Sequence, residues 1–176
     1  MCSLFTTVLL ACFVQAADEE NPYKRANVGD WVEYKMTGPN CSGRTKMTIV
    51  AKDDKEVTYD VAATFSFPGR EMVAPVQKIK VDLTKSYDPI MAANLQRTGV
   101  TFQKQGEGKE KIKLGEKEFE TKWTKVQSTS TTNQFTTVTE HKMWFSKAVP
   151  LSGLVKMEIT TSTVTTTLEL IGSGTK

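Results

Sequence analysis

The sequence predicts a mainly β protein: an antiparallel sheet with about eight to ten strands and one short helix. Two observations lead to this fold class. Apolar and polar residues alternate with a period of two through most of the chain after Val28, which is typical of strands with one buried face. The segments between these runs are short and rich in Gly, Pro, Asp and Asn, the residues that tight turns require.

The first half of the chain is expected to hold four strands, over residues 30–37, 45–52, 56–67 and 78–84. The third is the clearest, because every second residue from Val57 to Phe67 is apolar and the residues between them are mostly polar. Turn residues follow each of the first three strands. These three strands should therefore pair in sequence order as a meander.

A short helix is expected between Tyr87 and Gly99. Asp88 can cap its first turn, Pro89 suits the first helical position, and Gly99 can end it. The residues between them are mostly good helix formers.

The second half returns to alternation, with strands expected over 110–114, 116–127, 135–146, 154–159 and 164–170. Residues 105–109 are predicted to form a flexible turn because of their two glycines, and 128–133 a Ser/Thr-rich loop. The alternation changes phase between Ile159 and Val164, so a hairpin is expected at 160–163.

The first 16 residues are interpreted as a signal peptide that forms a helix. They carry no charge, include an apolar run shorter than the about 20 residues of a membrane span, and end in a cleavage site between Ala16 and Ala17. No Lys or Arg precedes the apolar run, which is unusual for a signal peptide. The interpretation predicts an extracytoplasmic protein, either periplasmic or secreted, with no transmembrane span after cleavage.

Leu9-Leu10-Ala11-Cys12 also resembles a bacterial lipobox, which leaves a second destination open. In that alternative Cys12 carries the lipid and tethers the same domain to a membrane. Cleavage after Ala16 would instead leave Cys41 as the single cysteine, so no internal disulfide is expected.

Length and composition predict one folded domain over 28–172, after a flexible segment at 17–27 and before a tail at 173–176. Hydrophobic residues make up 39% of the chain and charged residues 24%, which is typical of a globular protein. The net charge is +3, and lysines and glutamates are closely mixed, as in Lys109-Glu110-Lys111. A nucleic-acid partner is not expected, because phosphate binding needs a patch of one sign.

The sequence holds no recognisable catalytic, metal or cofactor motif, so no enzyme activity and no cofactor are expected. His141 is the single histidine, which excludes a site with several histidine ligands, and no Gly-x-Ser-x-Gly elbow is present. We interpret His141 as a residue of the strand without a chemical role.

Two functional hypotheses of different classes remain. In the first, the concave sheet face binds an apolar small molecule or lipid, because five aromatic residues would share the interior if the sheet curls. These residues are Tyr59, Phe65, Phe67, Phe119 and Trp123. The alternative for the same residues is an ordinary packed core. The second hypothesis is a structural or protein-interaction component of the cell envelope, as the Thr-rich strand surfaces suggest.

Two stretches carry a resemblance to known proteins: residues 143–158, in which a strand with Trp144 leads through Pro150 and Gly153 into the next strand, and the opening run 29–34. They resemble small secreted proteins of planctomycete-type bacteria and periplasmic half-barrels of the lipoprotein-carrier type. The resemblance implies a curved antiparallel sheet around a helix, with one apolar concave face. Carrier-type proteins bind acyl chains on such a face, but no motif of this sequence carries that activity over.

Overall fold

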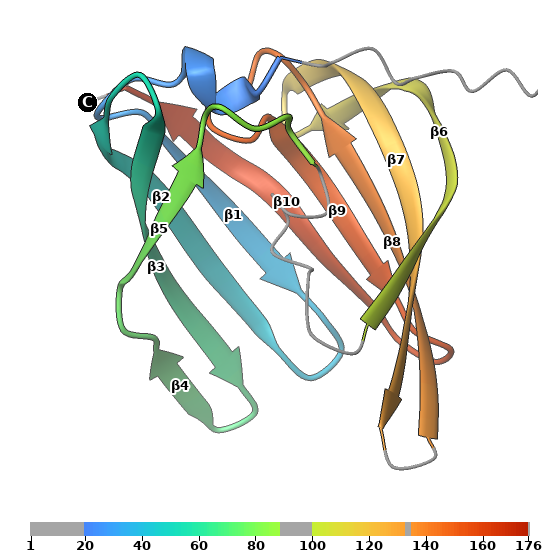
Figure 1. The fold of residues 1–176 in the computed structure, drawn as a ribbon. Helices are drawn as coiled ribbons and strands as arrows, with labels where there is room; N and C mark the ends of the chain where they lie inside the picture. The colour runs from blue at the N-terminus through green and yellow to red at the C-terminus, as the bar shows by residue number, and fades with distance from the viewer. Residues whose placement is uncertain (1–19, 89–99, 133–134, 176) are drawn as a thin grey trace, which may run out of the picture.

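The computed structural model describes residues 20–88, 100–132 and 135–175 (Figure 1). In this part of the chain, ten strands form one antiparallel sheet in the order β4-β3-β2-β1-β10-β9-β8-β7-β6, and β5 pairs with a further stretch of β3. The strands are β1 (Trp31–Thr37), β2 (Ser42–Lys52), β3 (Glu56–Phe67), β4 (Arg70–Val73), β5 (Gln77–Asp82), β6 (Val100–Leu114), β7 (Lys117–Thr132), β8 (Phe135–Phe145), β9 (Leu154–Thr160) and β10 (Thr165–Gly174).

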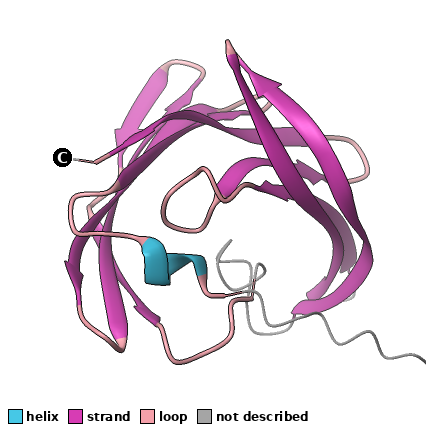
Figure 2. Ribbon diagram, turned by 90° about the horizontal axis from the view of Figure 1, so that it is seen from above, coloured by secondary structure: helices cyan, strands magenta, loops and turns pink. Residues whose placement is uncertain are grey.

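The sheet curls strongly about its own axis, as the view from above shows (Figure 2). The curl brings β6 into contact with β10, although β9, β8 and β7 lie between them in the sheet. The predicted fold class, a curved antiparallel sheet, is confirmed. The helix expected between Tyr87 and Gly99 and the signal-peptide helix fall mostly or wholly outside the described residues.

The turns between the early strands form as their residues predict. At the β2–β3 turn, the Asp53 side chain accepts hydrogen bonds from the backbone N–H groups of Lys55 and Glu56, both at 2.8 Å. These bonds favour the charged carboxylate and lower the pKa of Asp53. The β3–β4 turn depends on Gly69, whose φ of 74° is accessible to glycine at little cost. The hairpin expected at 160–163 is also confirmed, because Thr165 pairs with Thr160.

Two expectations for the second half are wrong. Residues 105–109 are not a turn but the middle of β6, and residues 128–132 are not a loop but the end of β7. The glycines fit a strand because the ring of Trp123 on β7 lies over them: a Cβ at Gly108 would be 2.8 Å from its Nε1 atom. The Ser/Thr-rich stretch fits a strand because three of its five residues at 128–132 are threonines, whose β-branched side chains suit a pleated surface.

The segment 17–27, expected to be flexible, contains a 3-10 helix, η1 (Pro22–Arg25), which covers the upper end of the curled sheet in Figure 1. Tyr23 is 2% exposed and stacks on Tyr59 of β3 at a centroid distance of 5.8 Å. The ammonium group of Lys52 donates to the carbonyls of Lys24 and Ala26, both at 2.7 Å. An apolar anchor and a cation at its carboxyl end therefore fix η1 to the sheet. At the other terminus, β10 extends to Gly174, into the segment expected as a tail.

Candidate functional site

Burial on the concave face changes from one end of the sheet to the other. At the end that η1 covers, inward side chains from five strands are almost fully buried. We call this set the sealed half: Val32, Ile49, Val57, Met143 and Val155. Tyr34 on β1 belongs to the same core, and its hydroxyl donates to the carbonyl of Leu154 at 3.0 Å. The sealed half is thus an ordinary close-packed core.

Two to four residues further along the same strands, or along their neighbours, the inward side chains are apolar but only half-buried. We call this set the open half: Met36, Met47, Val61, Ile159 and Leu168. They lie on β1, β2, β3, β9 and β10, and the register places Met36 opposite Leu168 and Met47 opposite Val61. Met47 also faces Val32 of the sealed half, and Met36 faces Gly43. The open half therefore consists of two neighbouring apolar groups, Met47 with Val61, and Met36 with Leu168 and Ile159.

One polar pair interrupts the concave face. His141 on β8 lies opposite Val126 of β7 and Ile159 of β9, so its side chain points to the concave side. Its Nε2 atom is 2.9 Å from the hydroxyl of Ser128 on β7. His141 and Ser128 are 6% and 8% exposed, and desolvation by this burial lowers the pKa of His141. At neutral pH the imidazole is therefore uncharged.

The five aromatic residues expected to line the interior are not brought together. Tyr59 belongs to the core beneath η1, and Phe65 is half-buried against Gly43 of β2. Phe67 is 41% exposed, and Phe119 packs against the edge of the core cluster. Trp123 was expected on the concave face but lies on the outer face of the sheet. It pairs with Trp144, and its side chain is on the opposite side of β7 from that of the buried Val126.

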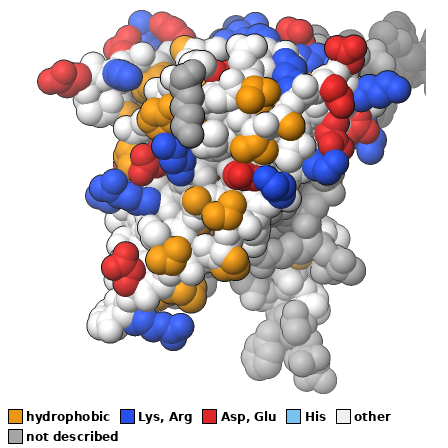
Figure 3. Space-filling model, turned by 90° about the vertical axis from the view of Figure 1, so that its left-hand side faces the viewer, with side chains coloured by type: hydrophobic (Ala, Val, Ile, Leu, Met, Phe, Trp, Pro, Cys, Tyr) orange, Lys and Arg blue, Asp and Glu red, His pale blue; other side chains and the backbone are white. Residues whose placement is uncertain are grey.

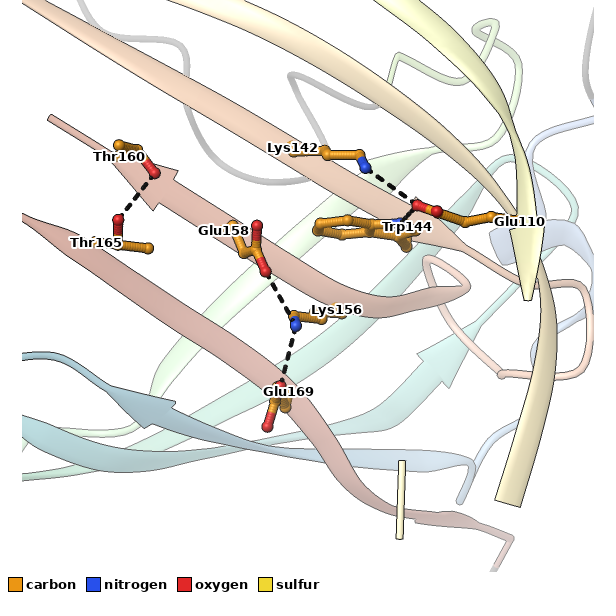
Figure 4. Close-up of polar contacts among 8 residues, drawn as sticks. All are labelled: Glu110, Lys142, Trp144, Lys156, Glu158, Thr160, Thr165 and Glu169. Atoms are coloured by element: carbon orange, nitrogen blue, oxygen red, sulfur yellow. Dashed lines mark hydrogen bonds and ion pairs between the residues drawn. The ribbon is translucent and has the colours of Figure 1, made fainter. Parts of the chain in front are cut away.

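The outer face near Trp123 and Trp144 holds a network of charges and rings (Figure 4). The ammonium of Lys142 lies 4.7 Å from the ring centroid of Trp123 and 4.5 Å from that of Trp144. Glu110 of β6 accepts hydrogen bonds from the indole N–H of Trp144 and from Lys142, and these bonds lower its pKa. Lys156 of β9 continues the network.

Burial opposes the charge of Lys156, but its contacts with Glu158 at 3.0 Å and Glu169 at 3.3 Å outweigh that effect and raise its pKa (Figure 4).

A shallow groove of about 260 Å³ runs beside this network, lined by Trp123, Lys125, Glu140, Lys142, Glu158 and Thr160. All of its charged groups are already paired: Lys125 with Glu140 inside the groove, and Lys142 and Glu158 with Glu110 and Lys156 beside it. The network therefore links neighbouring strands from β6 to β10.

The sequence identified His141 but missed its partner, because Ser128 was expected in a loop rather than on a strand. A signal was present: continuing the alternation of β7 from Val126 places Ser128 on the same face. Within the described ranges, no group of three His, Cys, Asp or Glu side chains could hold a metal ion. Over the same ranges, no helix has the length and apolar character needed to span a membrane.

No protein-family model matches the sequence, and no curated protein matches it. Among solved structures, it is similar to a Bacteroides fragilis protein that is thought to be exported and has a YmcC-like fold. The TM-score is 0.52 at 9% identity, over 85% of this chain and 97% of that chain. LprF from Mycobacterium bovis aligns over 89% of this chain and 90% of its own at 14% identity, but its TM-score of 0.39 is too low to support an argument. The first likeness supports the half-barrel architecture at the level of fold, while a planctomycete origin stays a prediction. The chain therefore shares its fold with a YmcC-like protein.

Proposed function

We propose that this protein is a non-catalytic extracytoplasmic protein that binds an apolar small molecule or lipid on the open half of its concave face. The observation that carries the proposal is that five inward apolar side chains from five strands are only half-buried: Met36, Met47, Val61, Ile159 and Leu168. Four of these residues, Met47, Val61, Ile159 and Leu168, pack against the core cluster on one side, and the apolar area they leave exposed is what a ligand would cover.

An acyl chain on the open half would remove this surface from water, at about 25 cal/mol for each Å² buried. Ligand sites of this kind are concave, mostly apolar and largely formed before binding. The sealed half gives such a site a rigid floor, since its side chains are close-packed beneath η1.

The extracytoplasmic location is supported by the uncharged apolar leader over residues 1–16 and its cleavage site between Ala16 and Ala17. Lipidation at Cys12 remains the alternative route, in which the same domain is tethered to a membrane. Mass spectrometry of the exported protein distinguishes them, since only cleavage after Ala16 gives an unmodified chain that starts at residue 17.

The binding proposal is tested with two neighbouring lysine substitutions on β10. Leu168→Lys places a charge on the open half, whereas Thr167→Lys places the same charge on the outer face, opposite Glu158. We expect a fluorescent alkyl probe without a carboxylate to bind the wild type and Thr167→Lys alike, and to bind Leu168→Lys at least about tenfold more weakly because a buried charge is costly. Equal binding by both folded variants, as judged by circular dichroism, would contradict the proposal.

One observation favours the second candidate, a protein-interaction role. Exposed apolar side chains gather on the side of the sheet formed by β3, β4 and β5 (Figure 3), among them Val73 at 74% and Val76 at 63% exposed. A photo-crosslinking residue at Val73 should then capture one reproducible envelope protein, and the same residue at Val164, in the β9–β10 turn, should not. No specific product from Val73 would remove this candidate.

A further inference from the structure

The His141–Ser128 pair is the one place on the concave face where a buried polar atom lacks a partner among the described residues. The Nδ1 atom of His141 is buried and accepts or donates no hydrogen bond within that part of the chain. Leaving such an atom unsatisfied destabilises a fold by about 1–3 kcal/mol. A buried imidazole that only filled space could be replaced by an apolar ring without this cost.

The surroundings of Ser128 indicate which nitrogen carries the proton. The Ser128 hydroxyl donates to the backbone carbonyl of Thr139 at 3.4 Å, and a carbonyl oxygen can only accept. A hydroxyl whose one proton is used there can only accept at its other contact, and on this ground we assign Nε2–H of His141 as the donor across the 2.9 Å separation. Since the ring is neutral, Nδ1 then holds a lone pair and can only accept a hydrogen bond.

The pair also lies directly beside the apolar surface. His141 faces Ile159 across the β8–β9 pairing, and Ile159 belongs to the open half. On its other side, Ser128 faces Phe102 of β6, which is half-buried against the core. His141 therefore borders the open half at Ile159, and because its Nδ1 atom is buried, the polar end of an amphiphile reaches it only when the side chains around it shift.

We propose that Nδ1 of His141 accepts a hydrogen bond from the hydroxyl group of an amphiphilic ligand, such as a fatty alcohol or an acylglycerol, whose chain lies on the open half. This inference rests on the proposed function and specifies the ligand class. A neutral acceptor selects a hydrogen-bond donor. It does not attract a carboxylate, which offers only lone pairs, or an ether, which has no proton to donate.

The test uses dodecanol and dodecyl methyl ether as probes, because they share a chain and differ in the hydroxyl proton. The chain has a single histidine, so long-range ¹⁵N spectra of tag-free protein report on Nδ1 and Nε2 of His141 alone. We expect the proton on Nε2 in the free protein, and a change in the Nδ1 chemical shift with dodecanol but not with the ether. A proton on Nδ1 in the free protein, or an unchanged Nδ1 shift with bound dodecanol, would overturn the inference.

Affinities give a second, independent measurement. The alcohol-to-ether ratio should be about tenfold higher in the wild type than in His141→Phe, which keeps a ring of similar size but removes the acceptor. Ser128→Ala should also lower the ratio, because Nε2 loses its acceptor and the ring can place its proton on Nδ1. Ser130→Ala, two residues along β7, should keep the wild-type ratio.

The outcomes separate this inference from the proposed function. If both probes bind but the ratio is the same in the wild type, His141→Phe and Ser128→Ala, the inference is wrong and the proposed function stands. If neither probe binds the wild type, both are wrong. Should His141→Phe fail to fold, the Ser128→Ala and Ser130→Ala pair and the wild-type spectra still decide.

Discussion

At the scale of single residues, the buried imidazole of His141 couples the stability of the fold to pH. Burial lowers its pKa below the usual 6.5, so between the folded and unfolded pKa values the unfolded chain binds more protons than the folded one. The free energy of unfolding should therefore hold steady above about pH 6.5 and fall as the pH drops below that value, until the folded-state pKa is reached.

The measurement is the urea midpoint between pH 7.5 and 5.5 for the wild type and His141→Phe. The variant should lack the fall in this window. The carboxylates Asp53 and Asp82 have lowered pKa values and lose their contribution only at more acidic pH, so they do not mask the effect. Parallel pH profiles for the two proteins would show that His141 is equally solvated in the folded and unfolded chain.

Residue roles were the part of the site that the sequence predicted least well. Alternation places Tyr59 and Phe65 on the concave side correctly, because both belong to one uninterrupted strand. It could not place Trp123 relative to them, because that depends on how two distant strands face each other in the curled sheet. The partner of His141 was lost for a local reason: hydroxyl-rich sequences suit loops and exposed strands equally well.

At the scale of elements, the packing of β6 on β7 depends on one glycine and a tryptophan. A Cβ at Gly108 would lie 2.8–2.9 Å from three atoms of the Trp123 ring, whereas a Cβ at Gly106 would lie 3.5 Å from the same ring. Gly108→Ala should lower the free energy of unfolding by about 1–3 kcal/mol, since the indole must shift away from its place beside Lys142.

Gly106→Ala is the matched control, with the same change on the same strand and against the same ring. It should be neutral or stabilise by up to about 1 kcal/mol, because alanine reduces the freedom of the unfolded chain. Urea unfolding followed by tryptophan fluorescence measures both. Equal midpoints for the two variants would mean that the Trp123 ring does not lie against Gly108 in solution.

These glycines also explain why elements were predicted unevenly. The bounds of β3 follow from the sequence because its alternation is unbroken from Glu56 to Phe67. In β6, Gly106 and Gly108 mimic a turn locally, and the residue that makes them suitable for a strand lies at position 123, on another strand. Sequence patterns of short range do not include such cross-strand contacts.

At the scale of the whole molecule, the alternation predicted antiparallel strands and the resemblance implied a curved sheet, but neither predicted how the two halves of that sheet meet. The contact of β6 with β10 joins strands that are distant in sheet order. It results from twist accumulated over several strands, and no single segment encodes that twist. The gradient from the sealed half to the open half has a second cause, which is that η1 covers only one end of the curled sheet.

An open sheet keeps edges, and β6 forms one of them over 15 residues, with β7 as its partner on one side. Edge strands expose backbone groups that can pair with another chain, and lysines on the edge oppose such pairing. Lys109 and Lys113 on β6 are exposed. Replacing both with valine should therefore cause concentration-dependent association, measured by light scattering, while circular dichroism stays unchanged.

The control is the double variant Lys35→Val with Lys46→Val. It removes the same charge from exposed positions on β1 and β2, which are paired on both edges, and it should stay monomeric. Association of the second variant to the same extent would assign the effect to net charge rather than to the edge.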